Sequence, residues 1–240
     1  MGRILLVTGT DTGVGKTIVA TWLAWLTSRS QRVALVKAVQ TGADPAVDGD
    51  EAFYRAALAG HPITTTTLAT FPEPLAPSIA ARRSGKRFRA QDIKRSCMEI
   101  AREHDLTIVE GSGGLMVPID EDTNFADFAR ALSARLVLVI RPGLGTLNHT
   151  ALTLEAAFRR NLSVEMLVCN GLAAKPGLLE TENLRFLRSH YPQISLITLR
   201  RLAPASLHRL SLLRPKILGD PPPLMDGSRL ERMELPQPDF

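Results

Sequence analysis

The residues best suited to chemistry lie in one glycine-rich segment, VTGTDTGVGKT at 7–17. Its glycines allow a tight turn in which several backbone N–H groups point at one anion. A strand-like run precedes the segment and a helical pattern follows, so the positive end of a helix adds to the same site. Lys16 can reach the β- and γ-phosphates of a nucleotide, and the Thr17 hydroxyl can bind Mg²⁺. The segment therefore predicts a phosphate-binding loop, or P-loop.

The spacing within this loop is unusual. Five residues separate Gly9 from Gly15, whereas the common P-loop has four between its first glycine and Gly-Lys. A glycine-rich turn that binds no ligand is the simpler alternative. We favour the P-loop because a lysine at a helix start beside glycines would otherwise have little use.

A second lysine, Lys37, lies near the end of the apolar run 33–39. If that run is a parallel strand, Lys37 projects toward the same sheet edge as the P-loop. A surface lysine is the plain alternative, because most lysines are exposed. The apolar neighbours of Lys37 favour a place in the site.

Two carboxylates are candidate metal ligands. Glu110 closes the largely apolar run 106–110, where an unpaired buried charge would be costly, so a cation or a donor is expected nearby. A hard cation prefers such oxygen ligands, although a solvated glutamate at a strand end is also open. Asp50 begins a helical pattern, where a helix cap and a metal ligand are both open. Asp48 is near enough to be the alternative ligand.

The elements that must position these residues alternate along the chain. Short, nearly continuous Val/Ile/Leu-rich runs predict strands covered on both faces. They lie at 3–9, 33–39, 106–110, 135–140 and 164–169. Between them, helical patterns are expected at 16–29, 50–60, 90–104, 124–133, 146–160 and 178–190. This alternation predicts an α/β fold with a mostly parallel sheet, helices on both faces and ligands at the carboxyl ends of the strands.

Length and composition favour one domain over residues 1–240, with 45% hydrophobic residues to fill a core. Prolines interrupt the stretch from about 200 to 240, which is expected to be irregular backbone. With no membrane span, no leader and only two cysteines, the sequence indicates a cytoplasmic protein without a disulfide framework. The net charge of +5 includes a basic cluster at 82–89 with one aromatic, Phe88. That cluster indicates a solvated face and no nucleic-acid partner.

Several motifs together resemble one known family, the dethiobiotin synthetases. GTDTGVGKT at 9–17 resembles that family's phosphate loop, extra residue included. Further similar segments, in the family's order, are KAVQTG at 37–42, EPLAPSIAA at 73–81, VEGSGG at 109–114, GLGTLNHT at 143–150 and CNG at 169–171. The resemblance covers roughly residues 3–171 and implies a P-loop NTPase fold.

The resemblance also implies roles for individual residues. Lys37, Lys16 and Thr12 would act on the transferred phosphoryl group, and Thr17, Asp50 and Glu110 would bind Mg²⁺. The implied nucleotide contacts are Gly13, Val14, Gly15, Lys16, Thr17, Ile18, Asp50, Glu110, Gly111, Ser112, Gly113, Asn170 and Gly171. The implied substrate contacts are Thr41, Gly145, Thr146, Leu147 and Asn148. From the residues alone, 143–148 is also an ordinary helix start with Thr146 as cap, and Asn170–Gly171 is also a good turn.

The implied reaction converts 7,8-diaminopelargonate, CO₂ and ATP into dethiobiotin, ADP and phosphate, a step of biotin biosynthesis. A carbamate attacks the γ-phosphate, and the second amine then closes the ring and expels phosphate. In the family a neighbouring subunit receives the substrate's tail carboxylate, so a homodimer is implied.

Three alternative functions stay open: an ATPase switch, an amidoligase, and a nucleotide-binding module without catalysis, in which Lys37 and Glu110 would be incidental. A related P-loop ATPase switch usually has an extra lysine early in the loop, where Gly9, Thr10 and Asp11 stand here. An amidoligase of the cobyrinate type normally carries a glutamine-cleaving domain, for which this chain is too short. ISLITLRRLAP at 194–204 replaces the family's proline-containing nucleotide loop, so the nucleotide is ATP or another triphosphate such as CTP.

Overall fold

An eight-stranded sheet forms the centre of the computed structural model, which describes residues 2–42, 49–203, 210 and 215–218. The strand order is β10-β9-β8-β7-β1-β6-β2-β4, and every pairing is parallel except that between β10 and β9. The strands are β1 (Arg3–Gly9), β2 (Val33–Lys37), β4 (Ile63–Thr67), β6 (Leu106–Gly114), β7 (Arg135–Ile140), β8 (Val164–Leu172), β9 (Ser195–Arg200) and β10 (Lys216–Leu218). The short strands β3 (Gln40–Thr41) and β5 (Thr70–Phe71) pair separately.

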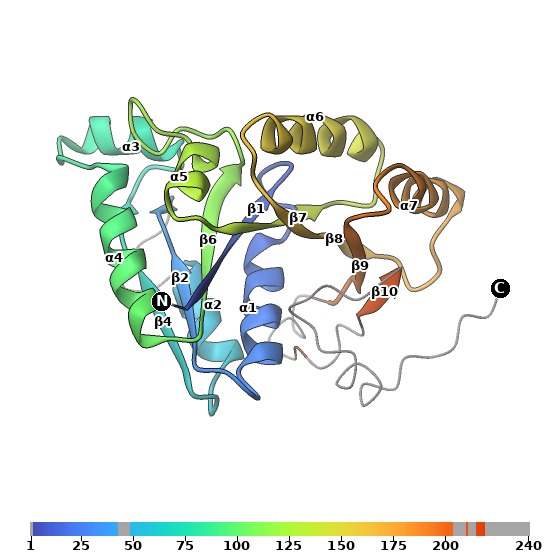
Figure 1. Ribbon diagram of the computed structural model, residues 1–240, viewed down its shortest axis with the longest axis horizontal. Helices are drawn as coiled ribbons and strands as arrows, with labels where there is room; N and C mark the ends of the chain where they lie inside the picture. Colours follow the sequence, from blue (N-terminus) through green and yellow to red (C-terminus); the bar gives the residue numbers. More distant parts are fainter. Residues whose placement is uncertain (1, 43–48, 204–209, 211–214, 219–240) are drawn as a thin grey trace.

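Helices cover both faces of this sheet (Figure 1). One face packs against α1 (Lys16–Thr27) and α2 (Asp50–Ala57). The other packs against α3 (Pro77–Ser84), α4 (Ala90–Glu103), α5 (Phe125–Ala131), α6 (Thr146–Phe158) and α7 (Leu178–His190). None of these described helices is long and apolar enough to cross a bilayer.

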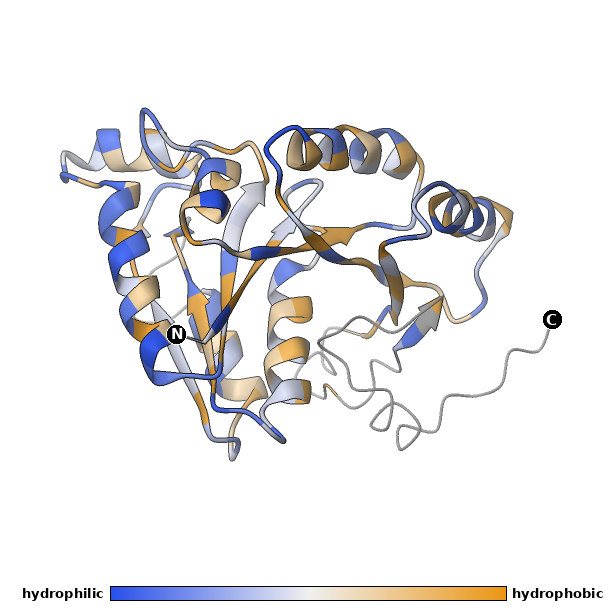
Figure 2. Cartoon of the chain, in the orientation of Figure 1, coloured by the Kyte–Doolittle hydropathy of each residue, from blue (hydrophilic) through white to orange (hydrophobic). Residues whose placement is uncertain are grey.

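Alternation along each strand fills both layers of core. In β1, Leu5 and Val7 face α1, whereas Ile4 and Leu6 face the opposite layer, as the two-residue period of a strand requires. Helix α1 is buried over most of its surface and is largely apolar in colour, whereas α4 has a polar outer side (Figure 2). The predicted α/β fold with helices on both faces is confirmed.

Strand β1 lies at the point where the strand order of the sheet reverses, and the P-loop follows β1 directly. From β1 the chain proceeds to β2 on one side of the sheet, and later to β7, β8 and β9 on the other. β6 and β7 flank β1 directly. Ligands of open parallel sheets bind at such a switch point, beyond the carboxyl ends of the strands.

Four elements differ from the sequence-based prediction. β4, whose sequence is ITTTT, and α3 were not predicted, because threonine does not register as apolar and α3 is short and rich in polar residues. β9 lies within 194–204, a segment that was not predicted as a strand. β6 continues four residues beyond Glu110, so this carboxylate lies within the strand and does not end it.

The stretch expected to be irregular contains some order. Residues 216–218 form β10 on the sheet edge, and Leu202 and Leu210 pack on the layer of α1. Residues 204–209, 211–214 and 219–240 lie outside the described part of the chain.

Candidate phosphate and metal site

The P-loop connects β1 to α1 and encloses the Lys16 side chain. Gly15 adopts φ +91°, in the left-handed region that favours glycine. Lys16 is 6% exposed, and its Nζ donates to the Asp11 carbonyl oxygen at 3.1 Å. Burial lowers the pKa of Lys16, and the nearby Glu110 opposes that shift. A phosphate would offer this buried ammonium a stronger acceptor than the Asp11 carbonyl.

Beside the loop, the Glu110 carboxylate and four neighbouring side chains form a cluster that draws on four elements. We call Thr17, Lys37, Asp50, Tyr54 and Glu110 the Glu110 cluster. Glu110 Oε1 accepts from Lys37 Nζ at 2.7 Å and from Thr17 Oγ1 at 3.0 Å. Its other oxygen, Oε2, accepts from the Tyr54 hydroxyl. Asp50 forms an ion pair with Lys37 and accepts from Thr17 Oγ1 at 2.9 Å.

The register of the sheet brings these groups together. Glu110 on β6 lies between two strand partners, Lys37 on β2 and Val7 on β1. Thr17 occupies the first turn of α1, while Asp50 and Tyr54 are one turn apart on α2. The predicted grouping of the P-loop threonine, a lysine and two carboxylates is therefore present.

Charges in the cluster balance at close range. Glu110 is 1% exposed and Lys37 is 4% exposed. Burial lowers the pKa of Lys37, but the attraction of Glu110 and Asp50 outweighs it and raises the pKa overall. Burial raises the pKa of Glu110, against the opposing effect of Lys37. Because the lysine pKa is raised, we take the pair as an ammonium and a carboxylate.

Asp50 does not act as a helix cap. The N-cap of α2 is Gly49, which has no side chain that could cap the helix. Asp50 follows it, with its carboxylate turned toward Thr17 and Lys37. Its backbone N–H donates to Gln40 Oε1 at 3.2 Å, which ties the start of α2 to β3. Asp48, the alternative metal ligand, lies outside the described residues.

The oxygen atoms of the cluster suit Mg²⁺. The Thr17 hydroxyl has one proton but lies within hydrogen-bonding distance of two carboxylates, Asp50 and Glu110. A hard cation bound by the same three oxygens would satisfy all of them. Mg²⁺ usually takes few protein ligands and completes its shell with phosphate oxygens and water, so a small oxygen set beside a phosphate loop fits this ion.

The glycine-rich end of β6 lies against the P-loop. A Cβ on Gly114 would lie 3.3 Å from the Gly9 carbonyl oxygen, and one on Gly113 would lie 3.7 Å from Thr12 Oγ1. Ser112, expected to contact the nucleotide, donates its hydroxyl to the Val39 carbonyl oxygen. Gly111 is buried beside the Phe125 ring.

Asn170 reaches the P-loop from the neighbouring side. Its Nδ2 donates to the Val14 carbonyl oxygen at 3.0 Å, across a sequence separation of 156 residues. A Cβ on Gly15 would lie 2.0 Å from the same nitrogen. Gly171 follows with φ +84° inside β8, where the register with β9 shifts between Asn170 and Leu172. The dipeptide therefore forms a bulge in the strand, and the alternative reading as a turn is wrong.

The predicted substrate segment lies at the start of α6. Gly145 is its N-cap with φ +87°, and Thr146 is 1% exposed with a hydroxyl that has no hydrogen-bond partner among the described residues. The expectation that Thr146 caps this helix is therefore wrong, since the glycine occupies the cap. Asn148 is exposed and Leu147 is partly buried between α6 and α7.

Within the described part of the chain, no hydrogen bond joins the predicted substrate residues, Thr41 and 145–148, to the Glu110 cluster. Thr41 is nearer, because Gln40 donates to its carbonyl oxygen while accepting from Asp50. Asp11 of the P-loop lies 4.0 Å from Arg141, at the end of β7 that leads to α6.

Sequence reasoning missed two residues of the site. Tyr54 lies four residues after Asp50, a spacing that puts both on one helix face, so this signal was present in the sequence. Gln40 lies within the KAVQTG segment but had no assigned partner.

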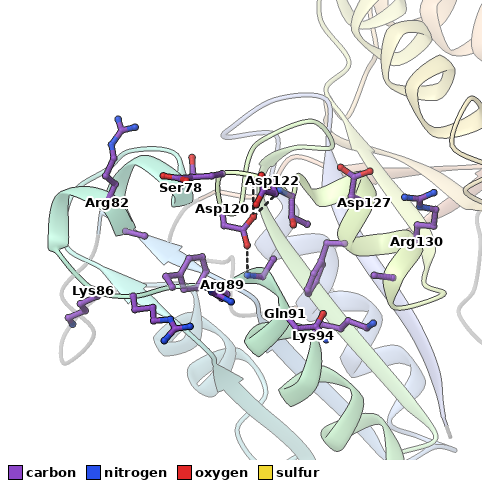
Figure 3. Close-up of a pocket in the computed structure, with 18 residues that line it drawn as sticks. Ser78, Arg82, Lys86, Arg89, Gln91, Lys94, Asp120, Asp122, Asp127 and Arg130 are labelled. Atoms are coloured by element: carbon purple, nitrogen blue, oxygen red, sulfur yellow. Dashed lines mark hydrogen bonds between the residues drawn. The ribbon is translucent and has the colours of Figure 1, made fainter.

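A pocket of about 700 Å³ lies away from this site, between α3, α4 and α5 (Figure 3). The basic cluster predicted at 82–89 forms one wall. Asp120 on the opposite wall accepts from the Ala90 backbone N–H at the start of α4. Arg82 points outward from the pocket in Figure 3, in keeping with a solvated basic face.

Comparison with known sequences gives close relatives. A family model described as an AAA domain matches residues 3–206. The ATP-dependent dethiobiotin synthetase of Saccharopolyspora erythraea is 46% identical over 176 residues, 73% of this chain and 77% of that protein. The protein of the same name from Rhodococcus erythropolis is 44% identical over 205 residues, 84% of this chain and 88% of that protein.

Solved structures share the fold at much lower identity. McdA from Cyanothece superposes with a TM-score of 0.58 at 14% identity, over 89% of this chain and 92% of that one. A ParA family ATPase from Chlorobium tepidum gives 0.53 at 13%, over 88% and 89%. At such identities the likeness concerns the fold alone.

Proposed function

The chain belongs to the AAA-domain family and, within it, to the ATP-dependent dethiobiotin synthetases, and from this premise we propose how its residues carry out the reaction. It is an ATP-dependent ligase that forms carbon–nitrogen bonds in biotin biosynthesis. We infer its substrates to be 7,8-diaminopelargonate, CO₂ and ATP.

The observation that best supports this assignment is the Glu110 cluster beside the P-loop. Two buried lysines, Lys16 and Lys37, approach from the loop and from β2. Two carboxylates and the Thr17 hydroxyl offer oxygen ligands between them. Phosphoryl transfer needs positioned charge more than a nucleophile–base pair, and this arrangement provides positioned charge.

We assign the lysines to charge neutralisation. A carbamate formed on one substrate amine must approach the γ-phosphate, and both groups are anionic. Lys16 would hold the β- and γ-phosphates, and Lys37 would lie beside the attacking carbamate oxygen. Thr12, near Gly113 at the mouth of the loop, would donate to the same oxygens. Nearby carboxylates keep the pKa of Lys37 raised, so it is a cation and not a general base at neutral pH.

We propose that Thr17, Asp50 and Glu110 hold Mg²⁺. When bound, the ion would supply positive charge that makes the γ-phosphorus more electrophilic. Glu110 then keeps Lys37 as a partner, while Asp50 is the more exposed ligand, at 26% of its side chain.

We propose that two copies of the chain complete the substrate site. Leu144 is 80% exposed and Leu152 is 57% exposed, and they flank the exposed Asn148 at four-residue spacing. Leu144 precedes α6 and Leu152 lies within it. Large exposed apolar side chains favour a protein partner. The start of α6 would offer free N–H groups to the tail carboxylate of a substrate bound in the other copy.

Adenine is the base that Asn170 would contact. Its side-chain amide already lies at the P-loop, and an amide can both donate to and accept from a purine edge. Comparing ATP with CTP in the product assay tests this base preference.

The test is product formation from 7,8-diaminopelargonate, bicarbonate, Mg²⁺ and ATP. We expect dethiobiotin, detected by mass spectrometry, and phosphate in equal amounts, with no phosphate above background when the diamine is omitted. Replacing ATP with CTP in parallel measures the base preference. Phosphate release that ignores the diamine, without a ureido product, would instead indicate an ATPase switch.

A further inference from the structure

Tyr54 has a place in the site that the reaction scheme does not require. It is fully buried on α2, among apolar side chains of the α1 layer. Its hydroxyl donates to Glu110 Oε2. A phenol hydroxyl carries its proton at neutral pH, so Tyr54 can act as a donor to this carboxylate.

The donors around Glu110 are divided between its two oxygens. Lys37 donates to Oε1, which also lies 3.0 Å from Thr17 Oγ1, and Tyr54 alone among the described side chains donates to Oε2. The carboxylate can rotate about its last bond, since terminal sp³–sp² torsions are broad. Tyr54 removes this freedom, because turning the carboxylate away would leave a buried hydroxyl without an acceptor.

We propose that Tyr54 is a positioning residue: it fixes the Glu110 carboxylate so that Oε1 faces Thr17, Lys37 and the metal-bound triphosphate. This inference rests on the proposed function, because it assigns Glu110 to that site. Partners behind a ligand carboxylate are worth about 10- to 100-fold in metal affinity in known sites.

One helix supplies both the ligand and its support. Asp50 and Tyr54 are one turn apart on α2, so docking of this helix brings a candidate ligand and the orienting hydroxyl to Glu110 together. Glu110 itself comes from β6, and the Tyr54 hydroxyl is the described contact from α2 to its Oε2. The apolar ring of Tyr54 packs the helix against the sheet, which a phenylalanine would do equally well.

The direct variant is therefore Tyr54→Phe, which removes only the hydroxyl. The chain has two tyrosines, and Tyr191→Phe, at the end of α7, is the matched control. Binding of the non-hydrolysable analogue AMPPNP is measured by calorimetry for both, with excess Mg²⁺ and with EDTA. We expect Tyr54→Phe to weaken binding roughly tenfold with Mg²⁺ and less than about twofold with EDTA. Tyr191→Phe should match the unmodified chain in both.

Turnover provides a second readout. Tyr54→Phe should raise the Mg²⁺ concentration needed for half-maximal rate and lower kcat, while KM for the diamine stays within about twofold, because the hydroxyl supports the metal side of the site. A loss of packing alone would not separate Mg²⁺ from the diamine in this way.

A double-mutant cycle with Glu110→Gln tests whether Tyr54 affects nucleotide binding through Glu110. If Tyr54 acts through Glu110, adding Tyr54→Phe to Glu110→Gln changes Mg²⁺-AMPPNP affinity by less than about twofold. Additive losses, equal weakening with and without Mg²⁺, or no weakening would each overturn the inference. A chain that binds Mg²⁺-AMPPNP but makes no dethiobiotin would contradict the proposed function, while the binding comparison still decides the role of Tyr54.

Discussion

Lys37 lies between two carboxylates that would otherwise repel each other in a dry site. Its Nζ contacts both Asp50 and Glu110, and the three groups come from different elements. A buried charge is tolerated only when it is paired, and removal of one partner is far more costly than the pair is stabilising. At the residue scale, Lys37 therefore pairs with the buried Glu110, and we propose that it also takes part in the reaction.

Replacing Lys37 with alanine tests both functions. We expect dethiobiotin formation to fall below detection, and the free energy of unfolding without metal to fall by about 3–5 kcal/mol, because Glu110 is left uncompensated. Mg²⁺ with nucleotide should restore part of that stability. Urea unfolding and the product assay measure these effects, with the exposed Lys86→Ala as control. Retained activity in Lys37→Ala would remove this lysine from the site.

The two cysteines give an independent check on burial. Cys97 and Cys169 are 0% and 1% exposed, and burial raises the pKa of each thiol to about 12. At pH 8 the thiolate fraction is then about one in ten thousand. We expect iodoacetamide to label neither cysteine in the folded protein and both in denaturant. Labelling of the folded chain at the rate of a free thiol would contradict the described core.

At the element scale, the site depends on strand register and on helix starts. Sequence patterns predicted the five central strands, the P-loop and the lysine and carboxylate positions, because buried parallel strands are apolar and their polar ends are conspicuous. They did not predict the Tyr54–Glu110 contact, since pairing across 56 residues is a property of packing. Nor did they predict that Gly145 caps α6, because Thr146 is the better cap by type alone.

Gly15 tests how closely the P-loop and β8 must approach. An alanine there would have to keep φ near +91°, a left-handed conformation that costs about 1–2 kcal/mol. Its Cβ would also lie 2.0 Å from Asn170 Nδ2. Gly60 has φ +81°, and a Cβ at that position would meet no atom within 4 Å, so Gly60→Ala has the backbone strain without the contact. We expect Gly15→Ala to lose the thermal stabilisation by Mg²⁺-ATP and Gly60→Ala to keep it. Equal shifts in the two variants would contradict a P-loop closed by Asn170.

At the scale of the whole molecule, we propose that a second copy covers the exposed leucines on either side of Asn148 and the start of α6. The leucines themselves do not indicate this in the sequence, because an interface leucine and a surface leucine look the same. The expectation of a homodimer came from the family resemblance.

Leu152→Glu tests the pairing of two chains. A charge in the middle of an apolar interface should yield a monomer by sedimentation and raise KM for the diamine at least about tenfold, because the carboxylate site of the other copy is lost. Ala131→Glu, an exposed change at the end of α5, is the control. An unmodified chain that is monomeric at full activity would contradict the shared site.

A crystal structure with Mg²⁺ and AMPPNP tests the account most directly. We predict the β- and γ-phosphates on the P-loop amides, the terminal phosphate between the Lys16 and Lys37 ammonium groups, and the metal on Thr17, Asp50 and Glu110. Phosphates bound elsewhere, or a metal remote from Glu110, would contradict the account.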